Sequence, residues 1–427
     1  GVNGVVVISG GEIQGCETGI SGQVTMTGGS VKNNKIGITI FAESTISGGT
    51  ITNESYDNTG INANTGKVTI SGTATISNCK NGIQTAVGAT MTGGTISTCE
   101  QGIYATNGDV NISGGEISGF THGINAGNST VTISGTAKIS AATGVFAGMV
   151  KMQGGTISNC NTVGFTGGTL TMTGGTLQDN TIGINSVGGA TMSGGTITNT
   201  TRANIGKNIG IKGVSGGVTI SDNATISYCY VAIDCPGKVV MTGGLIDASD
   251  MVKLGDNNNL TGATNYEVKI AGGEISNCGT AVHAGKVTMS GGTITNDTVK
   301  NTGLSVSGGS VSISGTATIS KCSTGVETGT FIISAGTLKN NNIAVDCSYT
   351  TTMTGGTMSN NTTAIKIYDN NVEMSGGTIT NDTIKNVGIY CDNTSANAGS
   401  VIINISGTAE ISNCGNGIST AGTVNVT

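Results

Sequence analysis

A short motif that recurs along the whole chain constrains its fold more than any other feature. Each copy has an Ile or Met followed by Ser or Thr and two glycines, or a variant of that pattern. The copies are marked by Ile8, Met26, Ile46, Ile70, Met91, Ile112, Ile133, Met152, Met172, Met192, Ile220, Met241, Ile270, Met289, Ile313, Ile333, Met353, Met374 and Ile405. This spacing predicts about 19 coils of roughly 22 residues, a repeat length typical of β-solenoids.

The residues within one copy predict three short strands per coil. Val24 and Met26 alternate with threonines, as expected of a strand that buries one face. Val31 begins a second strand after the Gly-Gly corner, and Ile36 and Ile38 flank Gly37 in a third. We therefore expect an all-β fold, a single right-handed parallel β-helix in which the backbone of each coil pairs with the next. Its handedness follows by analogy alone.

The repeats extend to both ends, so we expect residues 1–427 to form one continuous β-solenoid. Residues 1–3 resemble the close of a preceding coil, and residues 424–427 resemble the opening strand of a further one. Solenoids need polar caps at their ends. The sequence therefore predicts an excerpt of a longer chain with both ends uncapped, or with partners covering them.

Composition excludes several classes of protein. The chain holds 74 glycines and its charged residues amount to 10%, but it is rich in Val, Ile and Thr and so can bury apolar surface. Its net charge is −6 and its sole arginine is Arg202, which argues against a basic nucleic-acid surface. No apolar run is long enough for a membrane span in this segment.

The cysteines follow the repeat. One position, three residues after the second-strand Ile or Val, holds Cys16, Cys79, Cys99, Cys160, Cys229, Cys278, Cys322 and Cys414, and holds Asn34 and Asn180 in other coils. A second position holds Cys235, Cys347 and Cys391. Cysteine behaves as a small apolar residue, and no metal-binding spacing occurs. We interpret the first row as a structural core ladder of reduced, buried thiols, and expect no metal and no cofactor.

Four insertions interrupt the repeat, at 52–66, 200–217, 247–267 and 380–400. Loops on a rigid scaffold often carry recognition, so the predicted binding residues are Tyr56, Arg202, Asp250 and Asn393. The third insertion holds Asp247, Asp250 and Asp256. We interpret them first as solvated loop residues, then as a weak cation site, and last as a catalytic group. No carboxylate pair of the glycosidase kind is evident. The sequence therefore predicts a protein that is not an enzyme.

Threonines flank many of the markers, as at Thr25 and Thr27 or Thr171 and Thr173. Threonine ladders on a solenoid are one way to present a face to ice, but Thr is also simply a favourable strand residue. Lys151, Lys269 and Glu373 interrupt the row.

The recurring "GGTI", followed by Asn or Cys and then "GI", resembles the β-helical passenger and stalk repeats of large bacterial surface proteins. It is also similar to the "GGAI" repeats of polymorphic outer-membrane autotransporters, although their "FxxN" motif is missing. The resemblance covers the whole chain and implies a right-handed, pectate-lyase-like topology, surface exposure and an adhesive or spacer role. The resemblance assigns no catalytic residues to this chain.

We therefore expect a structural or adhesive segment of an extracellular bacterial surface stalk or fibre. The expected partners are host or neighbouring-cell surface glycans or proteins, adjacent coils of the same polypeptide, or further copies of the chain end to end. The alternatives are a carbohydrate-binding or carbohydrate-cleaving β-helix, an ice-binding solenoid, and the subunit of a filament that polymerises end to end.

Overall fold

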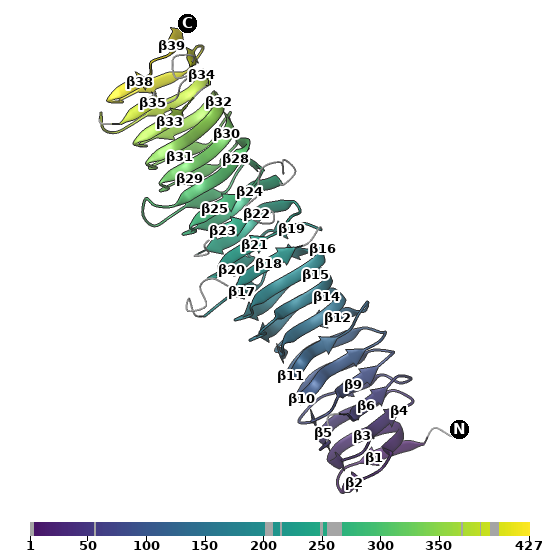
Figure 1. The fold of residues 1–427 in the computed structure, drawn as a ribbon. Helices are drawn as coiled ribbons and strands as arrows, with labels where there is room; N and C mark the ends of the chain where they lie inside the picture. Colours follow the sequence, from purple (N-terminus) through teal and green to yellow (C-terminus); the bar gives the residue numbers. More distant parts are fainter. Residues whose placement is uncertain are drawn as a thin grey trace. The chain divides into compact units, whose positions relative to one another are not determined.

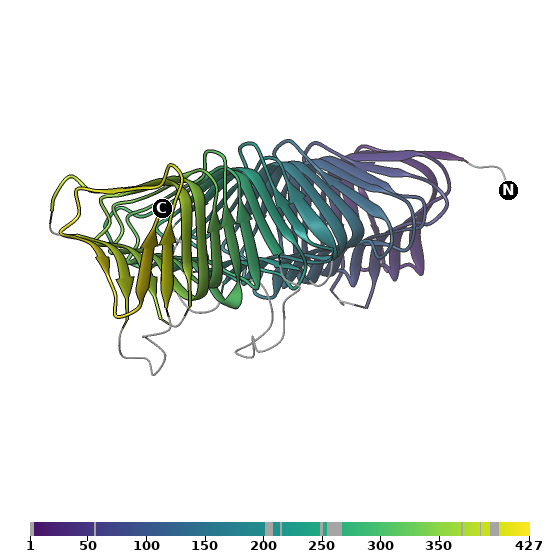
Figure 2. The same ribbon diagram turned by 90° about the horizontal axis from the view of Figure 1, so that it is seen from above.

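The computed structural model describes residues 4–54, 57–200, 208–213, 216–247, 251–253, 267–368, 370–384, 386–392 and 401–427. The chain divides into two compact units, Gly1–Gly216 and Gly217–Thr427. In both units the described secondary structure consists of β-strands, and coils lie side by side in the order of the sequence (Figures 1 and 2).

The strands of the first unit are β1 (Val5–Ile8), β2 (Glu12–Gln14), β3 (Thr18–Lys32), β4 (Ile36–Ile40), β5 (Ser44–Thr52), β6 (Thr59–Ala63), β7 (Val68–Ile70), β8 (Thr75–Ser77), β9 (Asn81–Thr85), β10 (Ala89–Ala105), β11 (Val110–Asn125), β12 (Thr130–Ile133), β13 (Lys138–Ser140), β14 (Thr143–Ser158), β15 (Val163–Gln178), β16 (Ile182–Met192), β17 (Thr196–Thr198) and β18 (Ile209–Gly213).

The strands of the second unit are β19 (Val218–Ile220), β20 (Thr225–Ser227), β21 (Val231–Asp234), β22 (Val239–Asp247), β23 (Met251–Lys253), β24 (Glu267–Ser276), β25 (Thr280–His283), β26 (Lys286–Met289), β27 (Thr293–Thr295), β28 (Thr302–Ile313), β29 (Thr318–Ser320), β30 (Thr324–Ile333), β31 (Thr337–Lys339), β32 (Ile343–Ser359), β33 (Thr363–Ile367), β34 (Val372–Thr380), β35 (Val387–Cys391), β36 (Ile402–Ile405), β37 (Glu410–Ser412), β38 (Asn416–Ser419) and β39 (Thr423–Val426).

Equivalent residues of successive coils pair in parallel. On β3 and β5, for example, Met26 pairs with Ile46 and Val31 pairs with Ile51. The markers found in the sequence are thus register positions, because each coil presents the same residue pattern to its neighbour. The prediction of an all-β parallel solenoid is confirmed for each unit.

The core of each unit is a column of inward side chains from the three strands. In the coil formed by β10, Met91, Ile96 and Ile103 are fully buried. The two largest buried side chains are Phe165 in the first unit and Phe331 in the second. Burying an aliphatic or Phe side chain stabilises a fold by about 1.5–3 kcal/mol, so the apolar repeat supplies most of the stability of a coil.

Glycine at the start of the third strand sets how closely neighbouring coils approach. A Cβ atom at Gly102 would lie 2.6 Å from the carbonyl oxygen of Gly123 and 2.5 Å from Cγ2 of Ile117. Gly123 is the equivalent residue of the next coil, and a Cβ atom there would lie 2.7 Å from the oxygen of Gly144. The glycine that recurs before this Ile or Val therefore leaves room for the next backbone.

The predicted insertions are partly strands. β6, β18, β23 and β35 fall inside them, and β6 pairs with both β4 and β9 at the third-strand position. The predicted boundaries were therefore too wide, since each of these coils keeps its third strand. Tyr56, Arg202, Asp250, Asp256 and Asn393 lie outside the described residues.

Candidate functional site

The predicted ladder of cysteines and asparagines is buried in the described coils that have a neighbour on both sides. Its buried members are Asn34, Cys79, Cys99, Cys160, Asn180, Cys229, Cys278 and Cys322, all at most 4% exposed. The expectation of burial was wrong for Cys16, which is exposed, and for Cys414, which is half-buried. Cys16 lies in the first described coil of the first unit and Cys414 in the last described coil of the second, so among the described residues each has a neighbouring coil on one side. None of the eleven cysteines is in a disulfide bond.

Thiols of the ladder donate hydrogen bonds within their own coil. The Cys79 Sγ donates a hydrogen bond to the carbonyl oxygen of Ser77 at 3.2 Å, and the Cys322 Sγ donates to that of Ser320 at 3.4 Å. Burial raises the pKa of Cys322 to about 12, although a hydrogen bond from Asn296 opposes this shift. Since the thiolate is the reactive form of cysteine, such a group is a poor nucleophile and a poor metal ligand at neutral pH.

Asparagine at the same position connects coils. The Oδ1 atom of Asn341 accepts the backbone N–H of Cys322 at 2.9 Å, and its Nδ2 donates to the carbonyl oxygen of Ile319 at 3.3 Å. Asn180 makes the equivalent pair of bonds to Cys160 and Ile157. The amide thus satisfies two backbone groups of the preceding coil, which buried polar groups require.

Asp247, the one described member of the predicted aspartate cluster, is also bonded across coils. It lies at the end of β22, where its Oδ1 accepts hydrogen bonds from Ser276 Oγ at 2.8 Å and from Asn277 Nδ2 at 3.1 Å. Both donors belong to the next coil. The structure therefore places Asp247 in a corner contact between coils.

The outward row of the third strand in the second unit carries a set of polar residues that the sequence reasoning missed. Its in-register members include His283, Ser305, Glu327, Asp346, Lys366, Tyr390 and Ser419. Each of them follows the inward third-strand Ile, Val or Leu. The row could have been found by aligning the residue after that position in every repeat.

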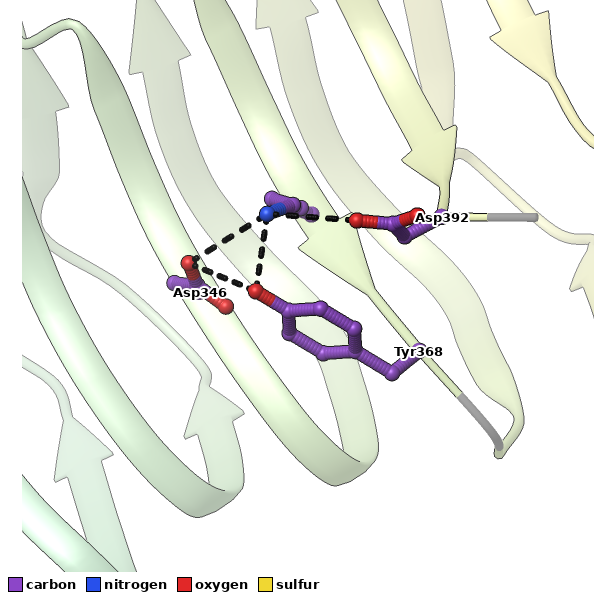
Figure 3. Close-up of polar contacts among 4 residues, drawn as sticks. Asp346, Tyr368 and Asp392 are labelled. Atoms are coloured by element: carbon purple, nitrogen blue, oxygen red, sulfur yellow. Dashed lines mark hydrogen bonds and ion pairs between the residues drawn. The ribbon is translucent and has the colours of Figure 1, made fainter. Parts of the chain in front are cut away.

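Four residues near this row form the densest polar cluster that we find on it (Figure 3). Asp346 lies on β32, Lys366 lies on β33 and is followed by Tyr368, and Asp392 follows β35. The Lys366 Nζ is 4.0 Å from Asp346 Oδ2 and 3.5 Å from Asp392 Oδ2. It donates a 2.7 Å hydrogen bond to the Tyr368 hydroxyl, which in turn donates to Asp346 Oδ2 at 3.3 Å. Figure 3 shows the three labelled side chains directed at one shared nitrogen.

Partial burial and pairing shape the titration of this cluster. Burial raises the pKa of Asp346 above its ordinary value, against the opposing effects of the Lys366 charge and the Tyr368 hydrogen bond. Burial alone would lower the pKa of Lys366, but the hydrogen bond to Tyr368 and the charge of Asp346 outweigh it, so that pKa is raised. The amine therefore stays protonated while both aspartates share it.

This arrangement can link three successive coils and present a polar surface. Both aspartates pair with one ammonium group, so the cluster lacks the separate acid and base that glycoside hydrolysis uses. Among the residues described, no three His, Cys, Asp or Glu side chains are grouped so that they could hold a metal ion. The arrangement thus joins side chains of successive coils through one ammonium group.

Replacing Lys366 with Gln is expected to destabilise the second unit by about 1 kcal/mol or less at pH 9, in the range of partly exposed ion pairs. The folded pKa of Lys366 exceeds its ordinary value of 10.5. Its contribution is therefore complete below pH 10.5 and is lost as pH rises through the folded pKa.

The measurement is the difference in thermal midpoint between wild type and Lys366→Gln at pH 9 and at pH 11. We expect the difference to shrink at pH 11, and Lys339→Gln, at an exposed site, to show no such trend. A difference in thermal midpoint that grew with pH would contradict the assignment of a raised pKa to the Lys366 amine.

Comparison of the chain with protein-family models, curated proteins and solved structures gives no match. In the part of the chain that the structure describes, no helix has the length and apolar character needed to cross a membrane. Any functional conclusion therefore rests on the residues and their geometry.

Proposed function

We propose that this chain is a structural and adhesive segment of an extracellular bacterial surface stalk or fibre. Its role would be mechanical, with stacked coils holding repetitive polar rows and loops in fixed positions. The observation that carries the proposal is the in-register parallel pairing of equivalent strands from coil to coil within each unit.

The chemistry of the coils supports this role. Described coils with a neighbour on both sides bury apolar residues against those neighbours, and buried asparagines such as Asn341 and Asn361 add side-chain bonds between coils. Separating two coils would break all of these contacts at once. Outward positions, by contrast, are mostly Thr, Ser and Asn, which suit a hydrated surface and repeated weak contacts with glycans or proteins.

Immunogold electron microscopy of the producing cells tests the proposal, with an antibody raised against this segment. We expect label along projections that extend from the cell envelope. Label confined to the culture fluid, on a monomeric protein, would contradict the assignment to a stalk or fibre.

A carbohydrate-binding role is the second candidate, and one row of the first unit favours it. Asn62, Gln84, Tyr104, Asn125 and Phe146 are in register on the outward face of the third strand. Phe146 is 38% exposed and its ring centroid lies 6.3 Å from that of His122. Amide groups can hydrogen-bond the hydroxyls of a sugar, and here they lie in the same row as the exposed ring of Phe146. This combination suits the binding of a neutral sugar chain. We propose no catalytic activity, because the paired carboxylates near Lys366 share a single amine.

Ice binding has less support. In the first unit the outward threonine row is interrupted by Asn111, between Thr90 and Thr132, and then by Lys151. In the second unit Lys269, Ile332 and Glu373 occupy the same row. A flat and uniform threonine face is therefore missing from this row in the described coils.

A further inference from the structure

Three lysines of the second unit gather around one carboxylate on the first-strand side of three successive coils. Lys238 directly precedes β22, Lys269 lies on β24 and Lys286 begins β26. Their Nζ atoms lie 3.8, 3.6 and 3.9 Å from the carboxylate oxygens of Glu267. The three amines are therefore close to one another, and the cluster carries a net charge of +2 in a chain whose net charge is −6.

The lysines are accessible whereas the carboxylate is more enclosed. Their side chains are 50%, 46% and 51% exposed, and that of Glu267 is 25% exposed. Contacts of this length between exposed groups contribute little to stability. An external anion can thus replace Glu267 as the partner of the amines at a small cost in free energy. In the free protein, Glu267 reduces the electrostatic repulsion among the three amines.

Successive coils place these amines along the direction in which coils stack. β22, β24 and β26 pair in register, Val239 with Val268 and Glu267 with Lys286. Neighbouring strands are about 4.8 Å apart, so a linear anion lying along this direction meets a positive charge at each of three coils. A single small anion would reach one or two of them.

We propose that Lys238, Lys269 and Lys286 form a binding site for a linear acidic polysaccharide. This inference deepens the proposed adhesive function, since it names the class of glycan and its site. Nucleic acid is the less suitable polyanion, because the chain has a single arginine, the side chain best suited to phosphate and nucleic-acid recognition.

The test compares the full chain with the triple variant Lys238→Gln, Lys269→Gln, Lys286→Gln by isothermal titration calorimetry. The probes are hyaluronate, which carries carboxylates, heparin, which carries sulfates as well, neutral dextran, and double-stranded DNA. We expect the wild type to bind at least one acidic polysaccharide, and more weakly as salt is raised. We expect the variant to lose at least tenfold in affinity and to show a smaller salt dependence.

A second triple variant, Lys300→Gln, Lys321→Gln, Lys339→Gln, is the matched control. These lysines also lie on successive coils, where backbone bonds join Lys300 to Lys321 and Lys321 to Lys339, and their replacement removes the same charge. We expect the control to bind like the wild type. Circular dichroism of both variants checks that they fold, as expected for substitutions of exposed side chains.

Three results would overturn the site: no binding of either acidic polysaccharide by the wild type, equal losses in both triple variants, or binding of DNA at least as tight as that of the polysaccharide. These outcomes are independent of the test of the proposed function. If the protein binds the polysaccharide in solution but is absent from surface projections, the proposed binding site is supported and the proposed stalk function is contradicted.

Discussion

Replacing Gly102 with Ala is expected to destabilise the first unit by about 1–3 kcal/mol, the usual cost of forcing extra volume into a packed core. The new methyl group would lie 2.6 Å from the Gly123 oxygen and 2.5 Å from Ile117 Cγ2. The clash with Gly123 is with backbone, so no side-chain rotation can relieve it. The coils of β10 and β11 must move apart, and backbone bonds between them lengthen.

Hydrogen exchange and thermal unfolding measure this effect. Because a solenoid coil contacts chiefly its neighbours, we expect faster amide exchange in residues 96–124 and a lower unfolding midpoint. Gly417→Ala is the control, since Gly417 holds the equivalent position in the last complete coil and a Cβ atom there would meet its nearest atom, Ile411 Cγ2, at 3.7 Å. Equal destabilisation by the two substitutions would contradict the role of close backbone approach.

Replacing Asn341 with Ala is expected to destabilise the second unit by about 1–3 kcal/mol, the cost of leaving buried polar groups without partners. The backbone N–H of Cys322 and the carbonyl of Ile319 would each lose a bond. Asn341 is 2% exposed, so water cannot easily replace the amide.

A graded series distinguishes this explanation from a simple loss of volume. Asn341→Cys is expected to lie between Ala and wild type, because a Cys sulfur at this position can accept the backbone N–H of the preceding coil, as Cys99 does from Cys79, but does not donate to a carbonyl of that coil as the amide does. Asn342→Ala is the control at an exposed neighbouring position. The measured quantity is the unfolding midpoint, and a Cys variant no more stable than the Ala variant would count against the hydrogen-bond explanation.

The ladder shows what pattern reasoning could and could not give. The spacing of Cys79, Cys99 and Cys322 predicted that they lie in one row, because residues at the same offset in each repeat occupy the same place in each coil. It also predicted their burial, which the structure shows for these three. It did not reveal that Asn both accepts from and donates to backbone groups of the preceding coil, whereas thiols such as Cys79 and Cys322 donate to a carbonyl of their own coil. That difference depends on which donors and acceptors lie opposite each side chain.

The candidate sites were hidden for a related reason. Asp346, Lys366 and Asp392 are about one repeat apart in the sequence. Taken singly, each has the pattern of an ordinary polar residue on or next to a strand. Lys238 and Glu267 are separated by a long insertion, so nothing in the linear sequence pairs them. The sequence reasoning favoured the insertions as binding regions, and Glu267 and Asp392 lie within two of them. The residues that it named there, Tyr56, Arg202, Asp250 and Asn393, lie outside the part of the chain that the structure describes.

The sequence by itself determined the parallel coil, its strands and its core, because a repeated pattern of Ile, Val, Gly and Thr satisfies the same local rules at every copy. Only the tertiary structure decided which outward side chains meet. Insertions of unequal length change the sequence separation between neighbouring coils while the backbone register stays fixed. Contacts such as those of Lys366 and Glu267 follow that register, and it becomes visible only when the coils are stacked.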